Sequence, residues 1–154
     1  MNYQYLDTPI GTLRLVSNGA QLIKIEFEGQ YSDDDGIAAN DAVLAASADQ
    51  LTDYFSAQRR HFNLPLAARG TRFQQSVWEA LADIPYGELR SYRDIARIIG
   101  NPAAVRAVGA ANGRNPLPIV VPCHRVIGSN GTLTGFAGGL KAKSFLLQLE
   151  GAMN

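Results

Sequence analysis

The sequence predicts an α+β protein made of two small domains, residues 1–68 and 71–154. The first part contains short segments in which apolar and polar residues alternate. This pattern is expected for a sheet with one buried and one solvent-exposed face. The second part contains several capped helical segments separated by short turns. The charge divides in the same way: residues 1–70 carry five basic and nine acidic side chains, whereas residues 71–154 carry nine and five. The chain as a whole is neutral, but its second half carries a net positive charge. This half is therefore suited to bind an anionic partner.

Alternating apolar residues predict three strands near the N-terminus, at residues 3–7, 12–17 and 22–27. Asn18 and Gly19 stand between the second and third segments, and an Asn-Gly pair is a strong signal for a tight hairpin turn. The first strands are therefore expected to form an antiparallel sheet.

A helix and a fourth strand complete the expected first domain. Asn40 or Asp41 caps the helix, which runs to about Phe55 and carries an apolar stripe, and the strand spans residues 62–66. The acidic run Asp33–Asp35 is expected to be a solvated loop, since no pattern of metal ligands flanks it. His61 likewise has no second ligand nearby and is assigned to the edge of a strand.

The second domain begins after a linker at residues 67–70, with Thr71 capping a helix to about Ala82. Ser91 and Asp94 form a capping box that opens a second helix, which Gly100 ends.

Asn101 is expected to cap a third helix, with Pro102 at its first position, that runs to about Asn112. Two short helices joined by a glycine-containing turn predict a helix-turn-helix, and the second of them carries Arg106. Its remaining residues are mostly small. Such a helix can approach another surface closely, although small residues also allow tight packing inside a core. The positive charge of this half favours nucleic acid over simple core packing.

The only cysteine of the chain, Cys123, is followed directly by one of its two histidines, His124. Apolar runs at residues 119–121 and 126–127 predict two short buried strands with a bend between them. A bend allows the imidazole to approach the thiol, which adjacent residues of a regular strand could not do. The pair therefore indicates an activated cysteine nucleophile.

A glycine-rich loop at residues 135–139 and a helix from Leu140 to about Gly151 follow the cysteine. The loop lacks the phosphate-binding GxxxxGK[ST] pattern and is better suited to letting a flat ring approach backbone groups. Glu150, near the end of the helix, is a candidate third member of a Cys-His-acid set.

Composition excludes several other classes of protein. No apolar run approaches the roughly 20 residues of a membrane span, and the first residues lack a secretory pattern. A single cysteine cannot form an internal disulfide, which favours a reducing compartment. We therefore expect a cytoplasmic protein without contact to a membrane, and a monomer.

Seven blocks of the second domain carry a specific resemblance. They are Phe73-Gln74-Gln75-Ser76-Val77-Trp78, Ile84-Pro85-Tyr86-Gly87, Ser91-Tyr92, Arg106-Ala107-Val108-Gly109-Ala110, Asn115-Pro116, Pro122-Cys123-His124-Arg125-Val126-Ile127 and Gly135-Phe136-Ala137-Gly138-Gly139. In this order they resemble the O6-alkylguanine-DNA alkyltransferases, also called methylated-DNA–protein-cysteine methyltransferases. The resemblance implies a ribonuclease-H-like N-terminal domain and a winged helix-turn-helix-like C-terminal domain.

The resemblance implies direct reversal of DNA damage. Members of this family bind double-stranded DNA, flip an O6-alkylguanine or O4-alkylthymine out of the stack, and transfer the alkyl group irreversibly to a cysteine. That cysteine would be Cys123, with His124 as a base acting through a water molecule and Glu150 orienting it. Asn115 would brace the bend, and Tyr92 would rotate a phosphate and supply a proton to the departing base.

The resemblance also implies a DNA contact surface and a substrate pocket. Arg106 would fill the space left by the flipped base, and the recognition helix would enter the minor groove. The expected DNA contacts are Arg106, Tyr92, Ala104, Ala107, Asn112, Gly113, Arg114 and Arg125. The expected pocket residues are Pro118, Val126, Phe136 and Ala137.

Two alternatives belong to other functional classes. A non-catalytic lesion-binding relative would lack the cysteine that this chain retains. A helix-turn-helix transcription regulator would read base sequence and would leave the thiol inert. No cofactor is expected. Some family members hold a structural zinc in the first domain, but residues 1–70 here contain no cysteine, so no metal is expected.

Overall fold

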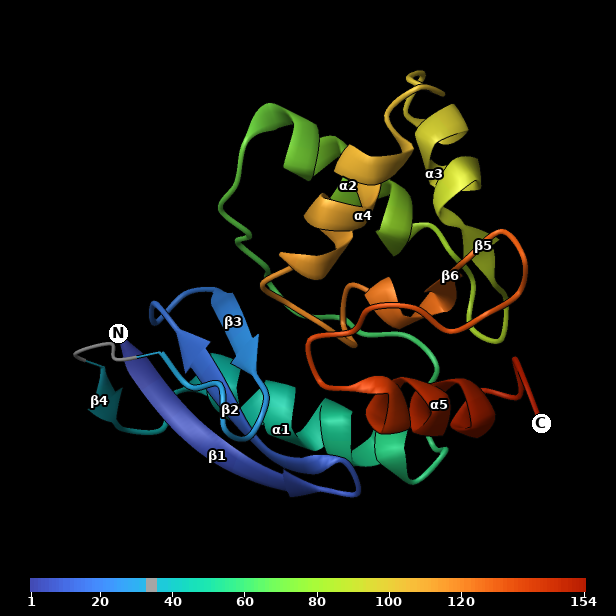
Figure 1. Cartoon of the computed structure of the whole chain (residues 1–154). Coiled ribbons are helices and arrows are strands. Elements are labelled where there is room, and N and C mark those ends of the chain that lie inside the picture. The colour runs from blue at the N-terminus through green and yellow to red at the C-terminus, as the bar shows by residue number, and fades with distance from the viewer. Residues whose placement is uncertain (33–35) are drawn as a thin grey trace. The chain divides into compact units, whose positions relative to one another are not determined.

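The computed structural model describes residues 1–32 and 36–154 and divides the chain into two compact units, Met1–Ala68 and Arg69–Asn154 (Figure 1). The first unit is a sheet with one helix, and the second is mainly helical with a small two-stranded sheet. The predicted α+β class is confirmed. The acidic run expected to be a solvated loop, Asp33–Asp35, lies outside the described residues.

A four-stranded sheet with the order β3-β2-β1-β4 forms the first unit. β1 (Asn2–Thr8) and β2 (Gly11–Ser17) are antiparallel, β3 (Leu22–Glu26) is antiparallel to β2, and β4 (Ile37–Ala38) runs parallel to β1. The three predicted strands are confirmed. β4 was not expected, since two residues are too few to show an alternating pattern.

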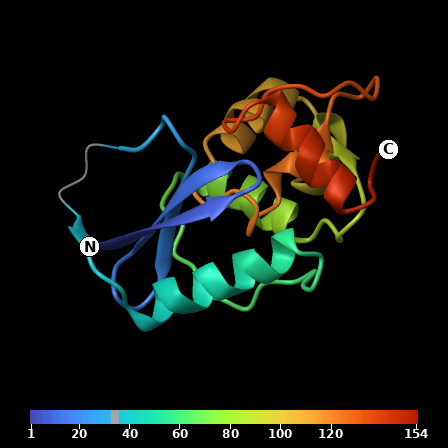
Figure 2. The same ribbon diagram turned by 90° about the horizontal axis from the view of Figure 1, so that it is seen from below.

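Helix α1 (Ala42–Phe55) lies along one face of this sheet (Figure 2). Asp41 is its N-cap: the side chain accepts a hydrogen bond from the Leu44 N–H at 2.8 Å. Asp41 also accepts a hydrogen bond from Asn2 at 2.9 Å and one from the buried hydroxyl of Ser17. One carboxylate thus ties the start of the helix to the first two strands.

The strand expected at residues 62–66 is wrong. Only Leu66 pairs with the sheet, in a single bridge to Leu22. Leu22 donates its N–H to the Pro65 carbonyl at 2.8 Å, and the Ala67 N–H returns to the Leu22 carbonyl at 3.0 Å. Pro65 has no N–H of its own, which limits extension of the ladder.

Helices α2 (Arg72–Ala82) and α3 (Tyr92–Ile98) of the second unit begin at the caps that the sequence predicts. The Thr71 hydroxyl accepts the Gln74 N–H, and the Gln74 side chain accepts the Thr71 N–H. Ser91 and Asp94 form the same reciprocal pair. Each capping box satisfies two of the N–H groups that a helix start leaves without partners.

Helix α4 (Val105–Gly113) begins later than predicted, so the expected cap at Asn101 is wrong. The Asn101 carbonyl accepts the Ala104 N–H at 3.0 Å in a separate turn, and Ala104 occupies the N-cap position without a side-chain hydrogen bond. Since Pro102 lies inside this turn, its fixed backbone angle supports the turn rather than the first residue of the helix.

The cysteine lies in one turn of 3-10 helix, η1 (Cys123–Arg125), followed by β6 (Val126–Ile127). β6 pairs in parallel with β5 (Arg90–Ser91), which confirms a short strand after the cysteine. The strand expected at residues 119–121 is wrong, because this segment forms a tight bend with one bridge between Pro118 and Val121.

Helix α5 (Leu140–Leu149) ends the fold, close to its predicted range. Within the described ranges, no helix combines the length and apolar character that crossing a bilayer requires.

Candidate active site

The bend before the cysteine is strained and braced. Ile119 has φ 74°, in the left-handed region that β-branched residues avoid. Asn115 spans this bend: its amide nitrogen donates to the Val121 carbonyl at 2.8 Å, and its oxygen accepts the Leu117 N–H at 3.0 Å. These two bonds fix the backbone that leads to Cys123.

Cys123 is 5% exposed, and its N–H donates to the Val121 carbonyl at 2.8 Å. Burial raises the pKa of the thiol to about 11, although a hydrogen bond with Asn115 and the charge of Lys143 offset part of this effect. The thiol is therefore protonated at neutral pH. A reaction that needs the thiolate requires a nearby base to remove the proton.

His124, the candidate base, is held in a defined orientation. Its Nε2 lies 2.7 Å from Glu150 Oε2, and both side chains are fully buried. Burial lowers the pKa of His124, although the hydrogen bond to Glu150 opposes this shift. A neutral ring that donates from Nε2 to a carboxylate keeps Nδ1 as an acceptor. Nδ1 is buried and has no hydrogen-bond partner among the described residues.

Arg125 is not a surface residue, and the expected DNA contact by its side chain is wrong. Only 6% of the residue is exposed. Its Nε and Nη2 donate to the two oxygens of Glu150 at 2.8 and 3.0 Å, and Nη1 donates to the Ile84 carbonyl at 2.6 Å. The reason is the compact η1 turn, in which all three side chains face inward.

Asn112 is also buried, so its expected role on a DNA-contacting surface is wrong. Together with Val108 and Ala111 it forms the buried stripe of α4, at the i, i+3, i+4 spacing of one helix face. The Asn112 amide nitrogen approaches the Cys123 carbonyl at 3.4 Å, and its oxygen has no partner among the described residues. The Asn112 side chain therefore contacts the backbone of the cysteine segment from α4.

Lys143 places a buried cation beside the site. Its ammonium donates to the Val126 carbonyl at 2.6 Å and to the Thr134 carbonyl at 2.7 Å. Burial lowers the pKa of Lys143 to about 8, and the Cys123 thiol opposes that shift. The lysine therefore joins β6 to the loop that precedes α5 and lies close enough to influence the thiol.

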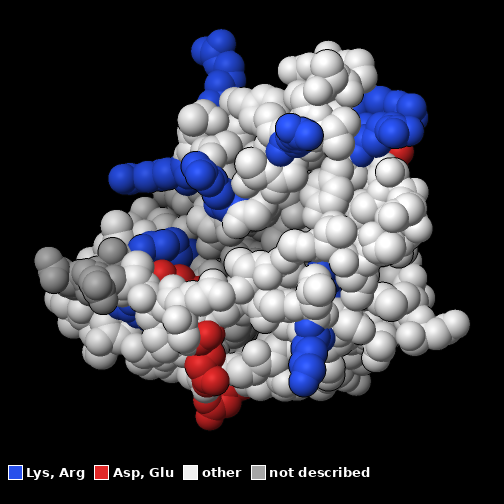
Figure 3. Space-filling view, viewed as in Figure 1, with Lys and Arg blue, Asp and Glu red and all other residues white. Residues whose placement is uncertain are grey.

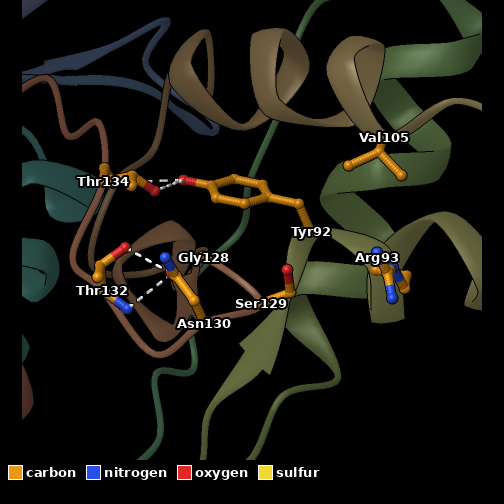
Figure 4. Close-up of a pocket in the computed structure, with 8 residues that line it drawn as sticks. All are labelled: Tyr92, Arg93, Val105, Gly128, Ser129, Asn130, Thr132 and Thr134. Atoms are coloured by element: carbon orange, nitrogen blue, oxygen red, sulfur yellow. Dashed lines mark hydrogen bonds between the residues drawn. The ribbon is translucent and has the colours of Figure 1, made fainter.

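Tyr92, the first residue of α3, points toward the same loop (Figure 4). Its hydroxyl lies 3.3 Å from the Thr134 carbonyl oxygen and 3.2 Å from the Thr134 hydroxyl. Tyr92 and Thr134 line an open cavity of about 380 Å³, whose other lining residues are Arg93, Val105, Gly128, Ser129, Asn130 and Thr132. Among the residues that the structure describes, no acidic side chain belongs to this lining.

The expected pocket residues occupy different environments. Pro118 and Val126 are buried, Phe136 is half-buried and Ala137 is exposed. None of the four lines the cavity beside Tyr92. Val126 is connected to that cavity through Lys143, which also binds the Thr134 carbonyl.

The remaining expected DNA contacts lie on or beside α4. Arg106, Ala107, Gly113 and Arg114 are exposed, and Ala104 is half-buried at the start of the helix. Basic side chains stand out from the helical unit on the face shown in Figure 3, with little acidic surface among them. This surface can approach a polyanion without charge repulsion.

The structure thus places the half-buried Asn115 beside the Cys123 thiol and the buried Glu150 against His124, and it links Tyr92 to the strand after the cysteine through Thr134 and Lys143. Sequence reasoning missed these last two residues. For Lys143 a signal existed, because it lies at i−3 and i−4 from the buried Leu146 and Leu147 of α5. A cation on an apolar stripe indicates a buried partner. Thr134, in an exposed loop, gave no such signal.

Two family models match the chain and together cover nearly all of it. The ribonuclease-like domain of 6-O-methylguanine DNA methyltransferase matches residues 1–68, and the DNA binding domain matches residues 72–152.

Curated relatives and solved structures agree with these matches. The chain is 47% identical over 155 residues to a methylated-DNA–protein-cysteine methyltransferase of Methanosarcina acetivorans, with 99% of each chain covered. It is 46% identical over 159 residues to the constitutive methylated-DNA–protein-cysteine methyltransferase of Bacillus subtilis, with 96% of this chain and 94% of that protein covered. A crystal structure of Mycobacterium tuberculosis OGT in complex with DNA is similar with a TM-score of 0.93 and 47% identity, covering 98% of this chain and 93% of the other.

Proposed function

The chain belongs to the 6-O-methylguanine DNA methyltransferase family, and from this premise we propose that it repairs alkylated bases in duplex DNA. The alkyl group of O6-alkylguanine or O4-alkylthymine is transferred to Cys123. The bond from carbon to the base oxygen breaks as the bond from carbon to Sγ forms. Because a thioether is a poor leaving group, each protein molecule acts once.

Proton transfer at the cysteine rests on one observation, the contact of 2.7 Å between His124 Nε2 and Glu150 Oε2. Glu150 holds the ring so that Nδ1 remains an acceptor, and the thiol proton passes to it through a water molecule. The buried Nδ1, which has no hydrogen-bond partner within residues 1–32 and 36–154, supports this route, since a buried polar atom without a partner costs about 1 to 3 kcal/mol. An ordered water would remove that cost.

Asn115 and Tyr92 have two further roles in the reaction, one at the nucleophile and one at the leaving base. Asn115 keeps the bend in place through its bonds to Val121 and Leu117, so that the sulfur holds its position while the bond forms. The Tyr92 hydroxyl rotates the phosphate of the flipped nucleotide and gives a proton to the departing base. Its place at the start of α3, next to an open cavity, supports both roles.

Recognition of DNA is assigned to α4 and its surroundings. The small residues Ala104, Ala107 and Gly113 allow the helix to approach the minor groove closely, and Arg114 contacts the backbone. Arg106 fills the space that the flipped base leaves, which offsets part of the unstacking cost of a few kcal/mol. The flipped base enters against Pro118, Val126, Phe136 and Ala137.

We assign DNA binding and alkyl transfer to residues 71–154 and place the protein in the cytoplasm as a monomer. The single cysteine supports this compartment, because a reducing environment keeps the thiol available.

Intact-mass measurement after incubation with an O6-methylguanine duplex tests the function. The protein is expected to gain the mass of one methylene group, and Cys123→Ser is expected to gain nothing. Unmodified wild-type protein at stoichiometric lesion would contradict the proposal. It would favour a lesion-binding protein if the duplex is bound tightly, or a helix-turn-helix regulator if binding depends on base sequence and ignores the lesion.

A further inference from the structure

The side chain of Thr134 makes a reciprocal contact with Tyr92 that the proposed reaction does not require. The Thr134 hydroxyl donates to the Tyr92 hydroxyl at 3.2 Å, and the Tyr92 hydroxyl donates to the Thr134 carbonyl at 3.3 Å (Figure 4). We propose that Thr134 is a positioning residue that holds the Tyr92 hydroxyl and strengthens it as a proton donor. This inference rests on the role of Tyr92 in the proposed function.

Thr134 is well suited to hold another side chain although its loop is exposed. Lys143, which is fully buried, donates to the Thr134 carbonyl at 2.7 Å and to the Val126 carbonyl at 2.6 Å. Residue 134 is therefore tied to β6, the strand that follows the cysteine turn. The position of the Tyr92 hydroxyl relative to the cysteine segment is fixed through this chain of bonds.

The same geometry allows the tyrosine proton to change partners. When a base enters, the Tyr92 O–H can turn from the Thr134 carbonyl to the base. Lys143 still donates to that carbonyl, so this acceptor keeps a partner. The Thr134 hydroxyl continues to donate to the phenol oxygen, and this bond stabilises the negative charge that develops there as the proton leaves. The remaining contact from the Thr134 hydroxyl to the phenol oxygen, 3.2 Å long here, would tighten in that complex.

Thr132 provides a matched control in the same loop. It also lines the cavity, but its hydroxyl donates to Asn130 Oδ1 at 2.7 Å rather than to Tyr92. Replacing either threonine by valine removes one hydroxyl group from the same loop. Of these two hydroxyls, that of Thr134 is the one that donates a hydrogen bond to Tyr92.

The test measures the maximal single-turnover rate of methyl transfer from duplex DNA at saturating protein. Thr134→Val, Thr134→Ser and Thr132→Val are each made in the wild-type protein and in Tyr92→Phe. Thr134→Val is expected to slow transfer about fivefold, which corresponds to about 1 kcal/mol for one hydrogen bond. Thr134→Ser restores the rate, and Thr132→Val retains it.

The decisive result is the effect in Tyr92→Phe, where Thr134→Val is expected to change nothing because the phenol oxygen is absent. Equal slowing in both backgrounds, a failure of Thr134→Ser to restore the rate, or full activity of Thr134→Val would overturn the inference. Melting temperatures and duplex affinities of the variants exclude a merely structural effect. If wild-type protein transfers no methyl group, the proposed function itself fails, which is a separate outcome.

Discussion

Arg125 and Glu150 form a buried bidentate ion pair, in which Arg125 Nε lies 2.8 Å from Glu150 Oε1 and Nη2 lies 3.0 Å from Oε2. Glu150 also meets His124 at 2.7 Å. Because the arginine already neutralises the negative charge of the Glu150 carboxylate, this carboxylate stabilises a protonated His124 less strongly. The burial that lowers the pKa of His124 acts in the same direction. The ion pair therefore helps to keep the imidazole neutral and able to act as a base.

Loss of Arg125 is expected to destabilise the protein rather than to weaken DNA contacts. Arg125→Met leaves the Glu150 charge buried without its main partner, which costs about 3 to 5 kcal/mol. Urea unfolding monitored by circular dichroism measures this change. Arg114→Met, at an exposed position, is the control and is expected to change stability by less than about 0.5 kcal/mol. An equally small effect at Arg125 would contradict the importance of the ion pair.

Glu150→Gln is expected to slow alkyl transfer by about a hundredfold or more, the usual contribution of an oriented base. The amide can also present its N–H to His124, which would favour the wrong tautomer. The rate is measured with an O6-methylguanine duplex and with free O6-benzylguanine. Both substrates should slow by similar factors, because the defect lies at the cysteine. Glu88→Gln, an exposed acid, serves as the control.

Arg106→Ala is expected to slow repair of duplex DNA about tenfold or more while leaving the reaction with free O6-benzylguanine unchanged. In the proposed mechanism Arg106 stabilises only the state in which a nucleotide has left the stack, and a free base needs no flipping. Single-turnover rates on both substrates provide the comparison, with Arg59→Ala in the other unit as the control. Equal losses on the two substrates would refute the flipping role.

The buried thiol predicts a specific pH dependence of stability. Burial raises the pKa of Cys123 from 9.0 to about 11. Below pH 9 both states keep the proton. As the pH rises from 9 to 11 the unfolded chain loses it first, so the free energy of unfolding falls by about 1.4 kcal/mol per pH unit.

Cys123→Ser isolates this effect, because serine does not ionise in that range while Lys143 and all other groups remain. The wild-type protein is expected to lose stability relative to Cys123→Ser only above pH 9, the ordinary value of the thiol. Urea titrations at pH values on both sides of 9 give the difference. A constant difference would show that the folded protein ionises this thiol as easily as the unfolded chain does.

Alkylation of Cys123 is expected to destabilise the folded protein. The residue is 5% exposed in a closely packed site, so an added methyl group must displace its neighbours at a cost of about 1 to 3 kcal/mol. Thermal unfolding before and after reaction with an O6-methylguanine duplex measures the shift. An unchanged or higher melting temperature of the methylated protein would contradict it.

Local sequence signals were reliable where they describe neighbours along the chain. The capping residues Thr71 and Ser91, the three first strands and the adjacency of Cys123 and His124 could all be read directly, and the first cap was narrowed to Asn40 or Asp41. The start of α4 could not, because Asn101 and Pro102 suit an isolated turn as well as a helix start. The short strand β4 exists only through its pairing with β1, which no local pattern records.

By itself the sequence determined the two-part α+β organisation, the helix starts and the family motifs around the cysteine, because short-range hydrogen bonding and periodic apolar residues specify them. Only the tertiary structure decided which polar side chains are buried. Arg125 and Asn112 suit an exposed DNA-binding surface as well as a core, and Glu150 lies 26 residues from the histidine it holds. Packing of η1 against α5 brings His124 and Arg125 to Glu150, since a buried charge is stable only where a partner from another element meets it.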